Sequence, residues 1–291
     1  MSAPIYAPYS GLNYRSAKRF MARQFLEAGF PFPDEDALDL VLGVTGLSHA
    51  DYAARGREFI DADTFARVRD AADRRLAGEP VDRILGYRDF YGRRFAIDGV
   101  LSPRGDTEVL LLAALEAVAD VDAPRLLELG TGSGALAVSL LAERADARVV
   151  ASDVSEDALA TAARNAQAHG VSDRLSLARS DWFADLPAAP VDAVLSNPPY
   201  ITDEAMAALS PEVRLWDPEL ALHGGADGLT AYRIIVPGAA ARLAPGGWLG
   251  VEIGFDQGEA VAALFDAHGF GDVRVLPDPA GLDRVVCGRK D

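Results

Sequence analysis

The chain has 291 residues, of which 49% are hydrophobic and 25% are charged, and its formal net charge is −16. This is the composition of a water-soluble globular protein long enough for a small and a large domain, and no apolar run approaches the ~20 residues that span a membrane. The single cysteine, Cys287, excludes an internal disulfide and a cysteine cage around a metal.

The acidic charge is concentrated in the second part of the chain. Residues 1–100 carry 14 Arg and Lys against 15 Asp and Glu, whereas residues 101–291 carry 14 against 29, which gives net charges of −1 and −15. Because such a surface repels a phosphate backbone, direct nucleic-acid binding is not expected. The opening segment "MSAPIYAPYSG" lacks the basic start and apolar core of a signal peptide, so we expect a cytoplasmic protein without membrane contact.

The first 85 residues are predicted to form a small helical bundle. Apolar residues recur at helical spacing in four stretches, which stop near Gly29, Gly46, Gly56 and Gly78. Ser48 is placed to cap the third helix. We therefore expect an N-terminal helical domain over residues 1–85.

A hairpin linker is predicted over residues 86–105. There "GYRDFYGRRFAID" alternates aromatic and charged residues around Tyr91 and Gly92. The next stretch, "SPRGDTEVLLLAALEAV", predicts a helix with Asp106 as its N-cap. The second domain then covers residues 106–291.

From Arg125 onward, apolar strands alternate with helices. The strand candidates are "RLLELG", "RVVASD", "LSLARSD", "VDAVLSN" and "WLGVEIG", and helices are expected after Gly134, Ser155 and Leu229. This alternation predicts an α/β fold with a mostly parallel sheet covered by helices on both faces. The ending "DVRVLPDPAGLDRVVCGR" holds two strands too close together for a helical crossover, so one of them is expected to be antiparallel.

The first two strands end at candidate ligand-binding residues, because ligands of open α/β sheets bind beyond the carboxyl ends of the strands. The turn "ELGTGSG" places Gly130, Gly132 and Gly134 at a helix start, where backbone N–H groups can approach a ligand closely. Taken alone, this turn also fits a structural tight turn or an imitation of the dinucleotide fingerprint. Asp153, which is 23 residues beyond Gly130, is placed to accept both hydroxyls of a ribose.

The third and fourth strands end at further polar groups. Asp181 can accept hydrogen bonds from an exocyclic amino group, and Trp182 offers a flat face. After the fourth strand, Asn197, Pro198 and Pro199 present a stiff edge made almost entirely of acceptors, since proline has no N–H and a fixed φ. The four strand tips together predict an adenosine ligand that faces a reaction site.

Metal chemistry is not predicted. The four histidines lie outside these motifs and show no metal-ligand spacing; they are His49, His169, His223 and His268.

These motifs resemble a known family. "LELGTGSG", "SDVSEDALATAARNA", "SDWFADL" and "SNPPYI" are similar to class I S-adenosylmethionine-dependent methyltransferases, and specifically to the protein-(glutamine-N5) methyltransferases of the HemK/PrmC type, which modify peptide chain release factors. The resemblance covers roughly residues 15–289, because "GEPVDRILGYRDFYGRRF" precedes the glycine loop and "DPELALHGGADGLTAYRIIV" follows it.

The resemblance implies a seven-stranded, mostly parallel sheet, S-adenosyl-L-methionine as cofactor, and a monomer whose residues 1–85 recognise the protein substrate. The implied cofactor-binding residues are Gly130, Thr131, Gly132, Ser133, Gly134, Asp153, Asp181, Trp182 and Asn197. The implied substrate-binding residues are Asn197, Pro198, Pro199 and Tyr200, of which Asn197, Pro198 and Tyr200 are the expected catalytic residues.

The chain departs from the family pattern at two positions. Gly105 stands where the family usually has a second proline after the arginine, which leaves the role of Arg104 open. Asp217 stands where a glutamate is common before the "P-x-x-AL" run.

The acceptor edge suits a planar NH2 group, whose nitrogen is a poor nucleophile because its lone pair is delocalised. If the Asn197 side-chain oxygen and the Pro198 carbonyl each accept one N–H, they fix the nitrogen and stabilise the positive charge that grows on it. Tyr200 would pack against the flat group. The resemblance then implies methyl transfer to the side-chain N5 of a glutamine in peptide chain release factors, within the Gly-Gly-Gln tripeptide of that family's substrates.

Four alternatives stay open from the residues. A related glutamine methyltransferase could act on a ribosomal protein, and an adenine or cytosine amino-methyltransferase could use the same edge, although it would need a basic groove. A module that binds the cofactor without reacting, or a dinucleotide oxidoreductase, would also use the glycine loop. The "NPPY" edge has no role in a dinucleotide oxidoreductase.

Overall fold

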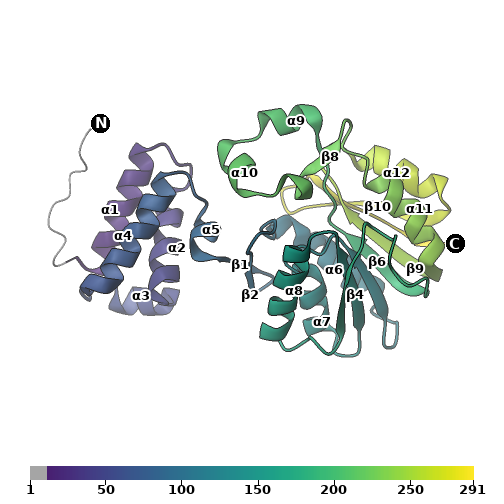
Figure 1. Cartoon of the computed structure of the whole chain (residues 1–291), viewed down its shortest axis with the longest axis horizontal. Coiled ribbons are helices and arrows are strands. Elements are labelled where there is room, and N and C mark those ends of the chain that lie inside the picture. The colour runs from purple at the N-terminus through teal and green to yellow at the C-terminus, as the bar shows by residue number, and fades with distance from the viewer. Residues whose placement is uncertain (1–11) are drawn as a thin grey trace. The chain divides into compact units, whose positions relative to one another are not determined.

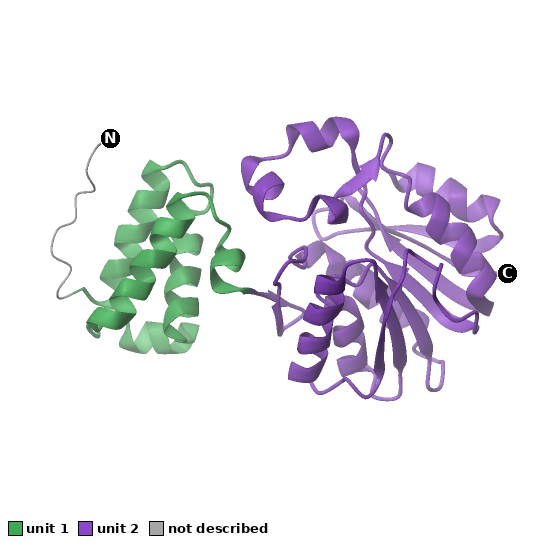
Figure 2. Cartoon of the chain, viewed as in Figure 1, with its two compact units in different colours: residues 1–86 green, residues 87–291 purple. Residues whose placement is uncertain are grey.

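The computed structural model describes residues 12–291 (Figure 1). It divides into two compact units, one up to Gly86 and one over Tyr87–Asp291 (Figure 2). The opening segment "MSAPIYAPYSG", on which the expected absence of a signal peptide depends, lies outside the described residues. Within residues 12–291, no helix combines the length and the apolar character that a membrane crossing requires.

The first unit is a helical bundle, as predicted. Its described helices are α1 (Tyr14–Glu27), α2 (Pro33–Thr45), α3 (His49–Arg55), α4 (Ala62–Leu76) and α5 (Val81–Leu85). The core is formed by α1, α2 and α4, and includes Met21, Phe25, Leu40, Val41 and Val68. The short helix α5 was not predicted, because five residues hold too little periodicity to be recognised.

The predicted helix ends agree with the structure. Ser48 and Asp51 form a reciprocal capping box at the start of α3. Gly46, which follows α2, has a φ of 73°, the left-handed conformation that glycine adopts without strain. Phe20 of α1 is 39% exposed, so it lies at the edge of the buried face.

The second unit begins with a hairpin and a helix. The hairpin pairs β1 (Tyr87–Phe90) with β2 (Arg93–Ala96), and the turn η1 (Gly105–Thr107) leads into α6 (Glu108–Ala117). The prediction that Asp106 caps this helix is wrong. The preceding turn moves the N-cap to Thr107, which makes no side-chain capping bond, and the Asp106 carboxylate instead lies 3.4 Å from Arg284 Nη2.

A seven-stranded sheet organises the second unit, with strand order β10-β11-β9-β6-β3-β4-β5. The strands are β3 (Arg125–Leu129), β4 (Arg148–Asp153), β5 (Leu175–Arg179), β6 (Val191–Ser196), β9 (Leu243–Glu252), β10 (Phe270–Pro277) and β11 (Asp283–Lys290). Strand β11 is antiparallel to β9 and β10, whereas β3, β4, β5, β6 and β9 pair in parallel. The predicted parallel sheet with one reversed strand is therefore confirmed.

Helices cover both faces of this sheet (Figure 1). The covering helices are α6, α7 (Ala135–Glu143), α8 (Glu156–Ala168), α11 (Tyr232–Arg242) and α12 (Gly258–Ala267). One apolar core lies under α6 and α7, and a second core lies under α11 and α12.

Cys287 is buried in β11, and burial raises the pKa of its thiol.

An insertion that was not predicted separates β6 from α11. It consists of β7 (Ile201–Thr202), α9 (Asp203–Ala208), α10 (Pro211–Trp216), η2 (Glu219–Ala221) and β8 (His223–Gly225). The pairing of β7 with β8 closes the insertion at its base. Because β7 follows Tyr200 directly, the insertion stands beside the "NPPY" edge.

Candidate active site

The four strand tips meet at one cavity of about 350 Å³. Strands β3, β4, β5 and β6 are parallel, so their carboxyl ends share one edge of the sheet. The predicted site residues that line the cavity are Gly130, Thr131, Gly132, Ser133, Asp153, Asp181, Trp182, Asn197 and Pro199. The three that do not line it are Gly134, Pro198 and Tyr200.

The glycine loop joins β3 to α7 in a backbone conformation that side chains rarely adopt. Gly130, Gly132 and Gly134 have φ values of 70°, 54° and 78°. The Gly132 N–H donates to Asp153 Oδ2 at 2.9 Å, which ties the loop to the tip of β4. Gly134 faces α8, and a Cβ placed there would lie 3.0 Å from the Cβ of Ala162.

Gly134→Ala is expected to destabilise the protein by about 1–3 kcal/mol. The left-handed backbone alone costs an L-residue roughly 1–2 kcal/mol, and the contact with Ala162 adds to that cost. Gly170→Ala is the matched control, because Gly170 has a φ of 68° but a Cβ placed there would have no neighbouring atom within 4 Å. Urea unfolding should show a larger loss for Gly134→Ala, and equal losses would contradict the packing role.

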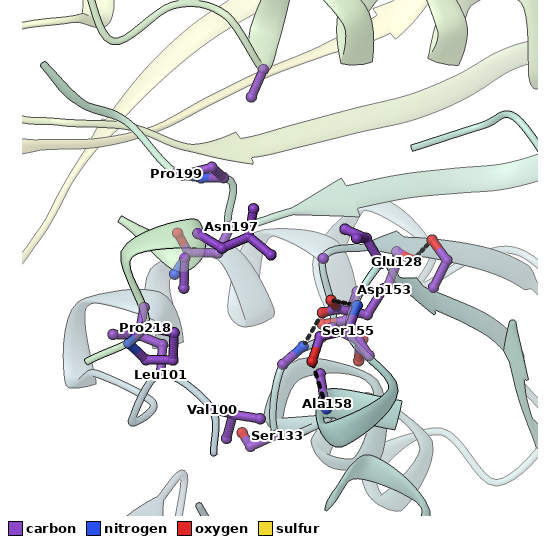
Figure 3. A pocket seen from close by; sticks show the side chains of 18 of the residues that line it. Val100, Leu101, Glu128, Ser133, Asp153, Ser155, Ala158, Asn197, Pro199 and Pro218 are labelled. Carbon is purple, nitrogen blue, oxygen red and sulfur yellow. Dashed lines mark hydrogen bonds between the residues drawn. The ribbon is translucent and has the colours of Figure 1, made fainter. Parts of the chain in front are cut away.

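Asp153 is held at the end of β4 by two backbone donors. The Ser155 N–H donates to Oδ1 at 2.9 Å, and the Gly132 N–H donates to Oδ2. Figure 3 shows both bonds, with Asp153 and Ser155 across the cavity from Asn197 and Pro199. Each carboxylate oxygen keeps a lone pair for a further donor, so Asp153 can accept two hydroxyl groups.

Asp181 and Trp182 reach the cavity on a tight turn after β5. Trp182 has a φ of 50°, an uncommon conformation for a large side chain. Ser180 stabilises the turn, because its hydroxyl donates to the Trp182 carbonyl at 2.9 Å and accepts from the Asp185 N–H at 3.1 Å. A strained backbone held this firmly beside a cavity is typical of a binding site.

The "NPPY" edge follows β6 and is fixed from several sides. The Asn197 Nδ2 donates to Thr107 Oγ1 at 3.2 Å. The Gln257 Nε2 donates to the Tyr200 carbonyl at 3.1 Å. Burial raises the pKa of Tyr200 to about 12, so its phenol stays neutral near pH 7.

Sequence reasoning missed Glu128, which is the fourth residue of β3. It lines the cavity and is 1% exposed, and burial raises the pKa of its carboxyl to about 8. Thr131 Oγ1 donates to Glu128 Oε2 at 2.7 Å. The signal in the sequence was a single acid inside the apolar run "LLELG".

His223 lies outside the strand-tip motifs in the sequence, but the structure brings it to the cavity. This residue begins β8 and lines the cavity, where its Nε2 lies 2.5 Å from Asp203 Oδ1. The pairing of β7 with β8 brings it there. Within residues 12–291, no three His, Cys, Asp or Glu side chains gather in a way that could hold a metal ion.

The two departures from the family pattern lie near one another. Arg104 comes directly before Gly105 and lines the cavity, and its Nη2 lies 3.4 Å from Asp217 Oδ2. The aspartate side chain therefore reaches the arginine despite being one carbon shorter than glutamate.

The cavity fits an adenosine-containing cation. Its apolar walls include Leu101, Leu136 and Trp182, which suit a flat base, and Asp153 suits ribose hydroxyls. The buried carboxyl of Glu128 gains a partner when a positive group approaches it. Strand order, the reversed β11 and the glycine loop define the chain as a class I S-adenosylmethionine-dependent methyltransferase in fold.

Comparison with known proteins agrees with this assignment of the fold. The Methyltransferase small domain family matches residues 105–211, and the PrmC N-terminal domain family matches residues 17–86. The hMettl16 catalytic domain superposes with a TM-score of 0.53 over 78% of this chain and 82% of its own, at 15% identity, which shows likeness of fold.

The chain is similar over nearly its whole length to proteins named release factor glutamine methyltransferase. The one from Cereibacter sphaeroides is 48% identical and the one from Agrobacterium fabrum is 44% identical, each across 94% of this chain and 97% of the relative. The chain belongs to the release factor glutamine methyltransferase family.

Proposed function

We propose that this protein transfers a methyl group from S-adenosyl-L-methionine to the side-chain N5 of a glutamine in peptide chain release factors, within a Gly-Gly-Gln tripeptide. The observation that carries the proposal is that Asn197 and Pro199 line the same cavity as Asp153. An edge that accepts N–H groups thus faces a site suited to adenosine. Relatives named for release factor glutamine methylation support this choice of substrate.

The cofactor would be held by the residues at the four strand tips. Backbone N–H groups of the glycine loop face the cofactor. Asp153 accepts hydrogen bonds from its ribose hydroxyls, and Asp181 accepts a hydrogen bond from its amino group. Trp182 covers its base. The positive charge of the cofactor would favour the ionised form of Glu128, which then balances that charge. When bound, S-adenosyl-L-methionine supplies a methyl group on a positively charged sulfur.

The substrate amide would be held by the "NPPY" edge. The Asn197 side-chain oxygen and the Pro198 carbonyl each accept one N–H of the glutamine, so the nitrogen is oriented before it reacts. Both acceptors bind more strongly as positive charge grows on that nitrogen, which stabilises the transition state. Tyr200 packs beside the amide as a neutral phenol, since the pKa near 12 excludes it as a base at pH 7.

Mass spectrometry of a release factor incubated with the protein and labelled cofactor tests the function. We expect one added methyl group on the glutamine of the Gly-Gly-Gln tripeptide, and no label when that glutamine is replaced by alanine. Ribosomal proteins serve as the competing substrates in the same assay. Labelling of a ribosomal protein in place of the release factor would overturn the proposal.

We also propose that the first unit recognises the release factor, and that the protein works as a cytoplasmic monomer. The first unit has a buried core of its own, formed by α1, α2 and α4. The PrmC N-terminal domain family matches the same part of the chain, residues 17–86. Contacts far from the reacting atom commonly provide the affinity for a large substrate.

A chain that begins at Tyr87 is expected to lose about tenfold in kcat/KM for an intact release factor, the effect of about 1.4 kcal/mol of lost binding. Its affinity for the cofactor should be unchanged, because every residue lining the cavity lies beyond residue 99. Calorimetry measures the affinity and steady-state methylation measures kcat/KM. An unchanged kcat/KM in a folded truncated protein would assign the first unit another role.

A further inference from the structure

Thr107 is a buried hydroxyl that contacts the "NPPY" edge from a distant part of the chain. It is the last residue of the turn η1, it is 4% exposed, and it lines the cavity. Its Oγ1 accepts a hydrogen bond from Asn197 Nδ2 at 3.2 Å, although 90 residues separate the two in the sequence. The contact therefore joins the start of α6 to the end of β6.

The hydroxyl proton of Thr107 has a partner of its own. Glu252, the last residue of β9, is 1% exposed, and the side chain of Thr107 is close enough to favour the ionised form of its carboxyl. Burial raises the pKa of Glu252 to about 7, and the side chain of Thr107 and the positive charge of Arg284 act in the opposite direction. In its ionised form Glu252 only accepts, so the Thr107 hydroxyl directs its proton to that carboxylate and keeps its lone pairs for Asn197.

Several charged groups around Glu252 act on the ionisation of its carboxyl. Arg284 Nη2 lies 3.0 Å from Asp278 Oδ2 and 3.4 Å from Asp106 Oδ2. The positive charges of Arg284 and Arg104 favour the ionised form of Glu252, whereas the negative charge of Asp106 opposes it. Glu252 Oε2 is buried and has no hydrogen-bond partner within residues 12–291, so this oxygen is open to accept the hydroxyl proton of Thr107.

We propose that Thr107, oriented by Glu252, is a positioning residue that holds the Asn197 side-chain amide with its oxygen free for the substrate. A carboxamide has two ends of equal size and opposite polarity, so shape alone does not decide which end faces the substrate. Only the NH2 end of Asn197 can bond to Thr107 when the hydroxyl proton is directed to Glu252. A flipped amide would bring two acceptor oxygens together and present NH2 to the N–H groups of the substrate, which it cannot bind.

This inference rests on the proposed role of Asn197 as an acceptor, and Thr107→Val tests it. Valine has nearly the shape of threonine but no hydroxyl, so the packing is kept while the orientation of the amide is lost. We expect kcat for release factor methylation to fall about tenfold, as for one lost hydrogen bond, with KM and the cofactor dissociation constant within about twofold of wild type. Thr107→Ser, which restores the hydroxyl, should recover most of kcat.

A double variant separates positioning from a general structural effect. Asn197→Ala together with Thr107→Val should be no slower than Asn197→Ala alone, because no amide is left to orient. If the two substitutions lower kcat independently, so that their fold losses multiply in the double variant, the inference is overturned. A wild-type kcat in Thr107→Val would overturn it as well. Thermal melting of each variant reports whether the fold is kept.

Nuclear magnetic resonance gives a readout that does not depend on the substrate. The Asn197 side-chain NH2 signals are identified by their loss in Asn197→Ala. In the wild type, we expect one of these protons to exchange slowly with water, and to exchange faster in Thr107→Val. Equal exchange in both proteins would overturn the positioning role. A wild type that shows the slow proton but methylates no release factor would support the positioning and reject the proposed substrate.

Discussion

Asn197→Ala is expected to lower kcat for release factor methylation by about 10²- to 10³-fold, the scale of one preorganised transition-state hydrogen bond. The loss should fall on the chemical step, because the Asn197 oxygen binds most strongly when the glutamine nitrogen is becoming positive. Single-turnover methylation measures this step. Cofactor affinity should change much less, because other strand tips provide most of the polar groups of the cofactor site.

Asn197→Asp gives a graded control. It keeps an acceptor in place, but it adds a negative charge and loses the donor that bonds to Thr107 Oγ1. The added charge stabilises the positively charged cofactor before the reaction as well as during it, so only part of the benefit lowers the barrier. We expect its activity to lie between those of the wild type and the Asn197→Ala variant. A near-normal chemical step in Asn197→Ala would show that the edge does not orient the amide.

Residues at the strand tips could be predicted from the sequence because chain order fixes them. Each apolar strand of the parallel sheet is followed at once by its polar residues, so recognising the strands places Asp153, Asp181 and Asn197 at one edge. The same reasoning could not tell which of them line the cavity. Pro198 and Tyr200 follow the same strand as Asn197, yet they are not among the residues that line the cavity.

The residues that support the site could not be predicted, because they come from other parts of the chain. Thr107 reaches Asn197 across 90 residues, and Gln257 reaches the Tyr200 carbonyl across 57. No local pattern marks such pairs in a single sequence. The same limit explains His223, which reaches the cavity through the pairing of two very short strands.

The prediction that Asp106 caps a helix failed because of the turn that precedes the helix. Its position before an apolar run favours an N-cap, but the turn η1 starts the helical path earlier and leaves Asp106 within it. The side chain then lies near Arg284, which belongs to the reversed strand β11. A tertiary ion pair thus replaces the capping bond that the local sequence favours.

Asp153→Ala is expected to weaken cofactor binding by about 10- to 100-fold. Hydrogen bonds to a charged group contribute roughly 1.5–3 kcal/mol each, and 1.4 kcal/mol is a tenfold change in affinity. The carboxylate also accepts from the Gly132 and Ser155 N–H groups, so its removal loosens the glycine loop that faces the cofactor. The dissociation constant of S-adenosyl-L-methionine is measured by calorimetry.

Glu156→Ala is the matched control for this prediction. Glu156 is a neighbouring acid in the first turn of α8 that does not line the cavity, and its carboxylate pairs with Arg179 at 2.8 Å. Like Asp153→Ala, this variant removes one negative charge near the end of β4. It should change the cofactor affinity by no more than about twofold, the scale of an exposed ion pair. Equal losses in both variants would mean that cofactor binding responds to the local negative charge and not to hydrogen bonds from the ribose. An unchanged affinity in a folded Asp153→Ala protein would remove Asp153 from the cofactor site.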